Sequence, residues 1–328
     1  MATVNSTSMS ILDAAKMSGA TGNILNCAEL LSKKTGMLQS IPWVATDEPE
    51  SHVSAQTTSL PTGSDIVHNQ ETAASKSTVA NILETTQGFE IWLTPADSVL
   101  NYGGNSGAKM AKEILRASEA MKQAVQYRYI LGNGDTTAGQ MYGFQVRYSS
   151  LSSNAARNII DCDGTGSNNA SIYYVRWSPE TIYGLYPKGT QAGLKMEDFG
   201  RVAVTTSSGE IVRRKVHLEW WFGLSIDDWR QAGRLCNIDI PALLAGTGAD
   251  LISRMNDMMA VIEDNTHGQG AFYMNRTVHA ALRRQSRLAV QTGGGMTYQN
   301  VNGQDVWDFN GVRVYIIDDL PIAESRVT

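Results

Sequence analysis

Residues 103–110 place glycines ahead of a lysine, the arrangement with which a phosphate-binding loop would hold a nucleotide. Lys109, however, follows Ala108 and precedes Met110, so the Gly-Lys-Ser/Thr ending of such a loop is missing. The glycine pairs at 132–134 and 164–166 lack the third glycine of a dinucleotide-binding fingerprint. We therefore expect ordinary turns at all three places and no bound nucleotide.

The residues that could bind a metal also lack the spacing of a known metal site. Asp161 and Asp163 begin like a calcium-binding loop, but the twelfth position, which needs a glutamate, is Ile172. The five histidines form no His-Glu-x-x-His motif, and the three cysteines, at positions 27, 162 and 236, are too scattered for a zinc site or a disulfide framework. We predict no metal, no cofactor and buried structural thiols.

Candidate catalytic residues also fail on spacing. Residues 223–227 depart from the nucleophile-elbow pattern at their last position. The neighbouring aspartates at 227–228 and 318–319 would point to opposite faces of a strand and would not converge. A hydrolase built from Asp227, Glu219 and His217 stays open as an alternative that only a turnover assay would support. We predict no catalytic residues and no enzymatic activity.

Composition narrows the class of protein. The chain has 328 residues, 27 basic and 32 acidic, for a net charge of −5, and only 18% of its residues are charged, against roughly 25% in a typical domain. With 42% hydrophobic residues it can bury a core of about two domains. The mild acidity argues against a basic nucleic-acid clamp. Since it has neither a signal peptide nor a run of ~18 apolar residues, we expect a soluble intracellular protein without a membrane partner.

The first half of the chain predicts an arm, an extended segment and a long helix. Residues 1–42 contain two short helical patterns, each too short to be stable alone. Residues 43–98 hold eight acids and one base, Lys76, and cannot form their own core, so we expect an extended hairpin or a long loop. Residues 106–131 repeat apolar side chains at helical spacing over roughly 37 Å and carry a local charge of +3.

The second half mixes strands and helices. Strand patterns occupy 171–177, 202–206 and 211–224, the last two joined by a turn at 208–209. Helical patterns follow at 249–264 and near 277–290, and a last strand is predicted at 312–317. Because strands and helices do not alternate, the order favours an α+β fold over a doubly wound sheet.

Several short stretches give the chain a family resemblance. They are 102–107 at the start of the long helix, 185–189 (Leu-Tyr-Pro-Lys-Gly), 192–194 with Glu197 and Asp198, and the pattern from Trp220 through 228–230 (Asp-Trp-Arg) to 237–239 (Asn-Ile-Asp). In this order they are similar to a family of tailed-phage major capsid proteins with the Hong Kong 97-type capsid fold. The resemblance is clearest over residues 99–240 and rests on the ordered combination of the stretches.

The resemblance implies a division of the chain into six segments. They are an N-terminal arm (1–42), an extended loop (43–98), a peripheral domain with the long spine helix (99–150), the first part of an axial domain (151–200), a peripheral hairpin (201–240), and the remaining axial domain with its closing strand (241–328). Some family members cross-link through a loop lysine. Lys76 is the only lysine in this loop and lies in no matching motif, so no cross-link is expected.

The resemblance further implies a structural protein that self-assembles as pentamers and hexamers into an icosahedral shell around double-stranded DNA, without sequence-specific DNA binding. Its location would be the virion capsid, assembled in the host cytoplasm. The implied partners are other copies of the chain, a separate scaffolding protein, a portal and optional decoration proteins. A cage-forming compartment protein of the same fold is the alternative.

A contact between neighbouring copies follows from the charges. We expect the acidic loop of one subunit to pack on the basic face of the long helix of the next, which would fix register and orientation more than affinity. The expected contact residues are Asp47, Glu48 and Glu50 on one side and Lys109, Lys112 and Arg116 on the other. Reversing the three bases to glutamate should impair assembly and leave the monomer folded.

Overall fold

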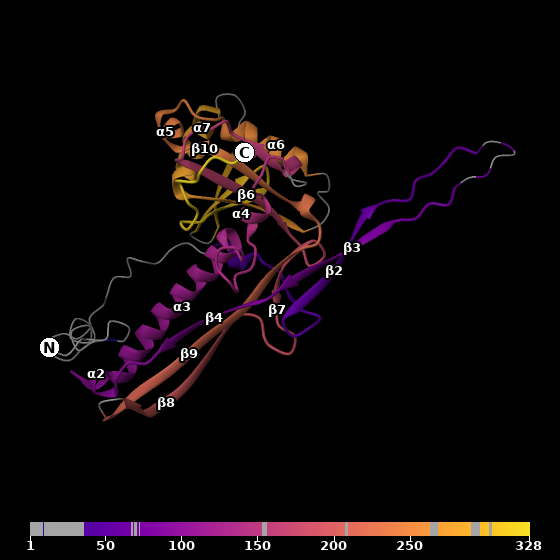
Figure 1. The fold of residues 1–328 in the computed structure, drawn as a ribbon. Coiled ribbons are helices and arrows are strands. Elements are labelled where there is room, and N and C mark those ends of the chain that lie inside the picture. The colour runs from indigo at the N-terminus through magenta and orange to yellow at the C-terminus, as the bar shows by residue number, and fades with distance from the viewer. Residues whose placement is uncertain are drawn as a thin grey trace.

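Two sheets and a projecting hairpin organise the chain in the computed structural model (Figure 1). The structure describes residues 9, 36–66, 68, 71, 73–152, 156–206, 209–262, 268–289, 296–301 and 304–328. The two short helices expected before residue 36 lie outside the described residues. None of the helices in the described part is long and apolar enough to cross a membrane.

A five-stranded sheet forms the lower lobe. The long strand β9 (Gly209–Ile226) pairs with β4 (Gln87–Leu93), β7 (Ile182–Tyr186) and β8 (Leu194–Thr206), and β7 pairs in parallel with β1 (Trp43–Ala45). Side chains alternate along β9, so Val216, Leu218 and Trp220 are buried while their neighbours face outward. One face of this sheet is therefore core and the other is open.

The helix α3 (Ser106–Leu131) covers the inner face of that sheet, lying lengthwise beside β4 and β9 (Figure 1). It begins after Gly103, Gly104 and a left-handed Asn105 (φ 55°), and it ends at Gly132. Met121 and Val125 bring its apolar face into the core. The predicted helix over residues 106–131 is confirmed with the same bounds.

A seven-stranded sheet forms the upper lobe. Its order is β12 (Met296–Val301), β13 (Gln304–Phe309), β14 (Val312–Ile316), β11 (Gln269–Met274), β6 (Asn169–Trp177), β10 (Ala232–Asp239) and β5 (Ile159–Asp161). All nine residues of β6 are buried, because both of its faces are covered. Tyr173 and Val175 pack into the core shared with α3, and Ile172 and Tyr174 pack into a second core. The core that contains α3 therefore extends through both lobes, and the second core belongs to the upper lobe alone.

Three helices close the second core. They are α5 (Ile240–Ala245), α6 (Leu251–Val261) and α7 (Arg276–Ala289). Asp239 and Asp250 cap the first two by accepting hydrogen bonds from backbone N–H groups. The shorter elements are η1 (Gly36–Gln39), α2 (Asp97–Asn101), α4 (Phe144–Arg147), η2 (Ala156–Asn158) and η3 (Trp229–Gln231). The mixed order of these elements confirms the predicted α+β class.

A buried ion pair fastens the last segment to the upper lobe. Arg234 on β10 donates from Nη2 to the Glu324 carboxylate at 2.8 Å, and the Ser171 hydroxyl donates to the same carboxylate at 2.5 Å. Arg234 also donates to the carbonyl oxygen of Tyr148. With Arg234 1% and Glu324 6% exposed, the charges have no access to water and depend on each other.

The sheets divide the chain at other points than the predicted segments do. Strand β7 and the first half of β8 fall in the segment expected to be axial, yet both pair in the sheet of the lower lobe. Strand β10 falls in the segment expected to be a peripheral hairpin, yet it pairs with β6 and β5 in the upper sheet. The six-segment division stays a prediction. The sheet pairings place the crossings of the chain between the lobes in three stretches, between β4 and β5, between β6 and β7, and between β9 and β10.

Candidate functional site

The hairpin of β2 (Ser51–Ser59) and β3 (Thr78–Thr85) leaves the body between the two lobes and projects away from both (Figure 1). Its inner face is tied to the body. Arg147 at the end of α4 forms a bidentate pair with Glu84, with N–O distances of 2.6 and 2.7 Å. The Gln56 side chain donates to the carbonyl oxygen of Asp227 at 2.6 Å. These bonds fix the direction in which the hairpin points.

A histidine adds a third tie at the base of the hairpin. The ring of His52 lies 2.8 Å from the Tyr183 hydroxyl through Nε2, and Nδ1 lies 2.8 Å from an oxygen of Asp47. Tyr183 in turn donates to the carboxylate of Asp227 at 2.9 Å, and burial is the main reason that its pKa is raised well above the usual range. The hydroxyl therefore stays protonated and keeps its donor role.

The outer face of the hairpin is uncovered. Directly paired residues of an antiparallel ladder point to the same side, which places Val53 beside Leu83 and Thr57 beside Val79. Val53, Leu83 and Val79 are 45%, 65% and 57% exposed. The only ionisable side chains on the two strands, His52 and Glu84, both face the body. The outer face is thus an uncharged stripe of apolar, hydroxyl and amide side chains.

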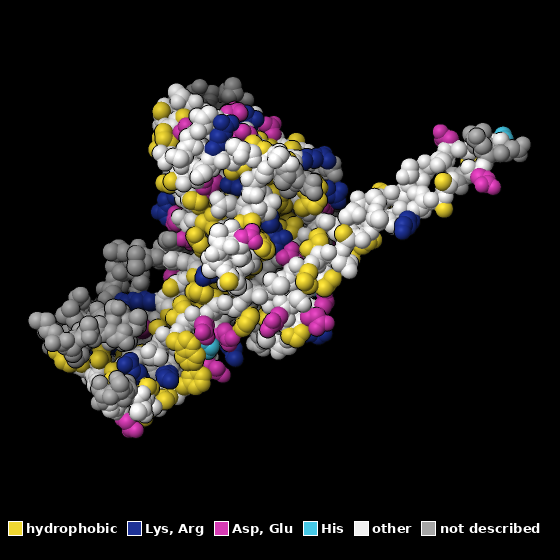
Figure 2. Space-filling model, viewed as in Figure 1, with side chains coloured by type: hydrophobic (Ala, Val, Ile, Leu, Met, Phe, Trp, Pro, Cys, Tyr) yellow, Lys and Arg dark blue, Asp and Glu magenta, His cyan; other side chains and the backbone are white. Residues whose placement is uncertain are grey.

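Beyond the paired strands two extended arms, 60–66 and 73–77, continue outward. Figure 2 shows them standing clear of the body. Leu60 and Ile66 are 80% and 88% exposed. In the described part of the arms, the one hydrogen bond joining them runs from the Thr62 N–H to the Ser75 hydroxyl. The arms bury nothing on their own chain.

The acidic contact residues predicted from the sequence lie together at the turn before β2. Asp47, Glu48 and Glu50 are all exposed. Asp47 is the partner of His52, and the carbonyl oxygen of Glu50 accepts the Thr86 N–H. The three carboxylates remain at the surface, where they are open to another chain.

The predicted basic residues are divided between surface and interior. Lys109 is fully buried, and its ammonium group donates to the carbonyl oxygen of Tyr102. Lys112 and Arg116 are half-buried, and Arg116 lies 3.5 Å from Glu113. Lys109 therefore holds the start of α3 in place and presents no charge to a neighbour. The expectation that its reversal to glutamate would spare the monomer fails for this residue, since a carboxylate there would be buried without a donor.

The structure does not bring the predicted acids and bases together within one chain. The acidic turn adjoins β7 and the base of the hairpin, while Lys112 and Arg116 lie on the half of α3 near α2, at the opposite end of the lower lobe (Figure 1). A contact between the two groups would have to join different copies.

The sequence patterns did not predict a second exposed surface, which lies on the lower-lobe sheet. On the outer face of β4 and β9 the Trp92 ring stacks on His217 at 4.0 Å between centroids, and Phe199 of β8 stacks on Trp92 at 5.9 Å. Trp92 and Phe199 are 48% and 50% exposed. Figure 2 shows hydrophobic side chains gathered where β4, β8 and β9 lie side by side, with acidic side chains beside them. Because Phe199 sits at a break in the strand register, the alternation of the sequence does not reveal it.

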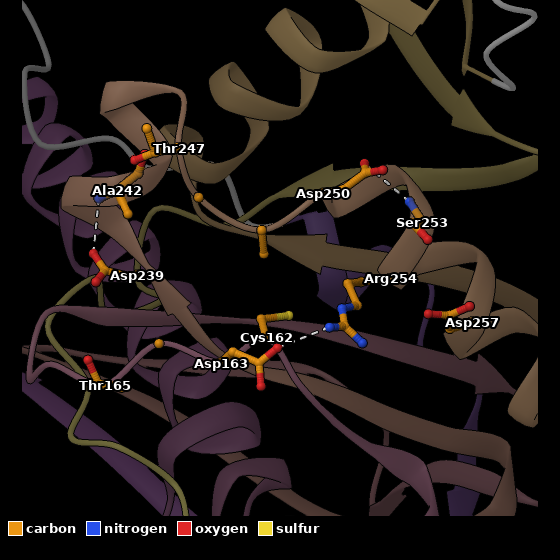
Figure 3. A pocket seen from close by; sticks show the side chains of 13 residues that line it. Cys162, Asp163, Thr165, Asp239, Ala242, Thr247, Asp250, Ser253, Arg254 and Asp257 are labelled. Atoms are coloured by element: carbon orange, nitrogen blue, oxygen red, sulfur yellow. Dashed lines mark hydrogen bonds and ion pairs between the residues drawn. The ribbon is translucent and has the colours of Figure 1, made fainter.

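One polar pocket lies in the upper lobe, and most of its polar side chains already have partners within the chain. It has a volume of about 480 Å³ and lies between α6 and the segment after β5 (Figure 3). Asp239 and Asp250 are occupied as helix caps, and Asp163 pairs with Arg254 at 3.1 Å. Burial raises the pKa of the Cys162 thiol to about 12, so it is not a nucleophile near neutral pH. No group of three or more metal-binding side chains occurs among the described residues.

The three residues of the hydrolase alternative have separate partners. His217 lies 2.9 Å from the Glu90 carboxylate, and Glu219 accepts the Trp221 indole N–H. Asp227 accepts hydrogen bonds from Tyr183 and from the Ser225 hydroxyl. None of these bonds joins two of the three residues to each other, so His217, Glu219 and Asp227 do not form one hydrogen-bonded catalytic set.

Comparison with known families gives the family of the chain. Residues 19–328 match the family described as major capsid protein GP7. The chain belongs to the major capsid protein GP7 family. It is a structural capsid protein, and the capsid fold expected from the sequence, that of the Hong Kong 97 type, is confirmed.

Comparison with solved structures gives three matches to report. The chain is similar to a structure of bacteriophage Epsilon15, with 26% identity over 100% of both chains and a TM-score of 0.78. It also resembles the capsid of bacteriophage JBD30, with 9% identity over 89% of this chain and 93% of the other and a TM-score of 0.47. The SrpI encapsulin of Synechococcus elongatus PCC 7942 matches 69% of this chain and 94% of its own, with 9% identity and a TM-score of 0.44. No curated protein matches the chain.

Proposed function

We propose that copies of this capsid protein assemble as pentamers and hexamers into an icosahedral shell that encloses double-stranded DNA, and that the protein has no enzymatic activity. The observation that carries the proposal is the hairpin, which exposes Val53, Leu83, Leu60 and Ile66 and buries none of its arms on its own body. Exposed apolar surface on a soluble chain marks an interaction site. In a homo-oligomeric shell that surface is covered by another copy.

The charge of the chain supports its role as a container. Each phosphate neutralised by a lysine or arginine adds salt-dependent affinity for DNA. With a net charge of −5, the subunit does not hold packaged DNA by charge neutralisation. We further propose the partners that such a shell needs, namely a separate scaffolding protein, a portal and optional decoration proteins, with assembly in the host cytoplasm.

Electrostatic contacts complete the proposal. Asp47, Glu48 and Glu50 of one copy would face Lys112 and Arg116 of the next, while Lys109 serves the fold of its own chain. Exposed pairs of this kind contribute about 0.2–1 kcal/mol each and mainly select orientation. Weak contacts in large number suit a shell, because misplaced subunits can leave and bind again.

Negative-stain microscopy of the purified chain tests the assembly. We expect closed shells, or pentamers and hexamers. A chain in which 60–77 is replaced by a two-residue turn should remain folded and fail to close shells. A wild-type chain that stays monomeric at every concentration and salt would contradict the proposal.

Charge reversal tests the electrostatic contact. Lys112→Glu combined with Arg116→Glu should reduce the yield of shells at low salt, and Lys122→Glu, an exposed base on the same helix, is the matched control. Normal yield from the double variant would remove these two residues from the interface.

A further inference from the structure

We infer that His52 is a proton-operated latch at the base of the hairpin. In its charged form, with a hydrogen on each ring nitrogen, His52 ties β2 to the lower lobe, and loss of one of these hydrogens weakens the tie. The latch is a property of the folded single subunit and does not depend on the proposed assembly into a shell.

The His52 ring belongs to a chain of polar contacts that crosses from the hairpin to the body. Nδ1 lies 2.8 Å from Oδ2 of Asp47, and Nε2 lies 2.8 Å from the hydroxyl of Tyr183 on β7. That hydroxyl donates to Oδ2 of Asp227 at 2.9 Å, and Ser225 donates to the other oxygen of the same carboxylate at 2.7 Å. His52 and Tyr183 are 9% and 4% exposed, so water has little access to the contact between them.

Three contacts in this chain require three hydrogens. Tyr183 has one, which it donates to Asp227, so its oxygen must accept a hydrogen from Nε2 of His52. The Asp47 oxygen lies off the direction of an Nδ1–H bond, but at 2.8 Å it is attracted to that nitrogen only if the nitrogen carries a hydrogen. A neutral imidazole has one N–H group and an imidazolium has two. Only the charged ring therefore satisfies all three contacts.

Moving the hydrogens does not remove the shortage. If the neutral ring keeps its hydrogen on Nδ1, it faces Asp47 and must accept the hydroxyl hydrogen of Tyr183 at Nε2. The Tyr183 oxygen then faces the Asp227 carboxylate at 2.9 Å with no hydrogen between them. In either arrangement the neutral ring leaves two lone pairs in contact, and a buried polar group without its hydrogen bond is destabilising.

Charged side chains approach the ring from each element packed against it. They are Asp47 in the turn before β2, Glu84 on β3, Arg147 on α4, Lys188 after β7 and Asp227 after β9. Glu84 and Arg147 neutralise each other. Lys188 donates to the backbone oxygen of Asp47 at 3.1 Å, and the carboxylate of Asp47 remains directed at the ring. A positive charge on His52 therefore has a carboxylate at each end of its chain of contacts.

His52 makes the base of the hairpin sensitive to pH near neutrality. The other ties are the Gln56 amide on the Asp227 carbonyl oxygen and the pair of Glu84 with Arg147. An amide does not titrate, whereas an imidazole ordinarily changes its charge between about pH 5 and 8. Because the charged ring makes the complete set of contacts, closure of the base is strongest at the acidic end of this range. It weakens as the pH rises and the ring releases its proton to the solvent.

Hydrogen exchange on the full-length subunit before assembly tests the latch. Protection factors, which remove the intrinsic pH dependence of exchange, are compared at about pH 5.5 and about pH 8. The amides of β2 and β3 should lose about tenfold in protection at the higher pH, as expected for the loss of one hydrogen bond to a charged group. The buried amides of β6 should change less, because β6 makes no contact with the ring.

Two variants assign the effect to the ring and its acceptor. His52→Gln removes the titrating group, so the protection of β2 and β3 should become the same at both pH values and match the wild-type level at the higher pH. Tyr183→Phe keeps the aromatic ring, removes the acceptor on the body and should also abolish the pH dependence. His68→Gln is the matched control, because His68 is an exposed histidine beyond the paired strands, and it should keep the full pH dependence.

Three results would overturn the latch. The first is equal protection of β2 and β3 in the wild-type subunit at the two pH values. The second is a pH dependence that survives in His52→Gln or in Tyr183→Phe. The third is an equal loss of protection in β6, which would indicate a change in global stability. None of these measurements requires shells, so failure of the assembly proposal would appear separately, by microscopy.

Discussion

The ion pair between Glu84 and Arg147 should stabilise the closed base of the hairpin without affecting the core. Both guanidinium nitrogens lie within 2.7 Å of a carboxylate oxygen, and the two side chains are 10% and 21% exposed. Exposed pairs contribute about 0.2–1 kcal/mol, and breaking a fully buried pair costs about 3–5 kcal/mol. A bidentate pair of intermediate exposure should contribute about 2 kcal/mol to closure of the hairpin base.

Glu84→Gln keeps the shape of the side chain and removes the charge. We expect local opening of the hairpin to become easier by about 2 kcal/mol, so amide hydrogens in β2 and β3 should exchange about thirtyfold faster. The buried amides of β6 should exchange at the wild-type rate, because no residue of β6 contacts the pair. Hydrogen exchange measured by mass spectrometry on the unassembled subunit resolves the two regions.

Glu90→Gln is the matched control, since Glu90 is an acid on the next strand, β4, and its side chain is 62% exposed. It should leave exchange in β2 and β3 unchanged. The double variant with Arg147→Gln should lose little beyond the single variants, giving a coupling energy near 2 kcal/mol. Unchanged exchange in the hairpin, or an equal rise in β6, would refute the assignment of the pair as a local anchor.

Three further predictions concern the stability of the unassembled subunit. Glu324→Ala should lower the free energy of unfolding by about 3–5 kcal/mol in equilibrium denaturation, because Arg234 then stays buried without a carboxylate. A loss below about 1 kcal/mol would contradict this reasoning. Burial raises the pKa of Cys162 to about 12 and of Cys236 to about 11. From about pH 8.5 upward these two thiols therefore ionise in the unfolded chain but not in the folded one. The free energy of unfolding should accordingly fall as the pH rises from about 8.5 towards 11. Native subunits should accordingly show no reactive thiol at either position at pH 8. Gly184→Ala should cost about 1–3 kcal/mol and lower the midpoint of thermal unfolding, since a Cβ there would lie 2.7 Å from the Ile41 side chain.

Elements with a local signature were predictable from the sequence. The 106–131 helix has apolar spacing, glycines before it and a glycine after it, and the structure gives it the predicted bounds. The helix predicted over 249–264 appears as α6 (Leu251–Val261), and the strand predicted at 312–317 appears as β14 (Val312–Ile316). In each case the periodicity of one face is sufficient, because that face packs on a single core.

Features that depend on distant pairing were not predictable. Strand β8 begins at Leu194, well before the predicted strand at 202–206. The register break between Asp198 and Gly200 interrupts the alternation of apolar and polar side chains, so the first half of the strand was not recognised as part of it. Lys109 appeared to belong to a basic helix face, and only the fold shows that the carbonyl oxygen of Tyr102 holds it inside. The family resemblance could be found from the sequence alone, because it rests on short stretches in a fixed order. Strand pairing and the burial of a lysine leave no such pattern in the sequence.

The uncovered surfaces of the subunit have a common physical meaning. The outer face of the hairpin and its two arms lie outside the shared core and add nothing to the stability of an isolated chain. Ordering the arms costs conformational entropy of about 1–2 kcal/mol per residue, which contacts within the same chain do not offset. The arms should therefore become ordered when a neighbour supplies backbone partners and apolar cover. If copies assemble as proposed, folding of the core and ordering of the arms are then separate steps.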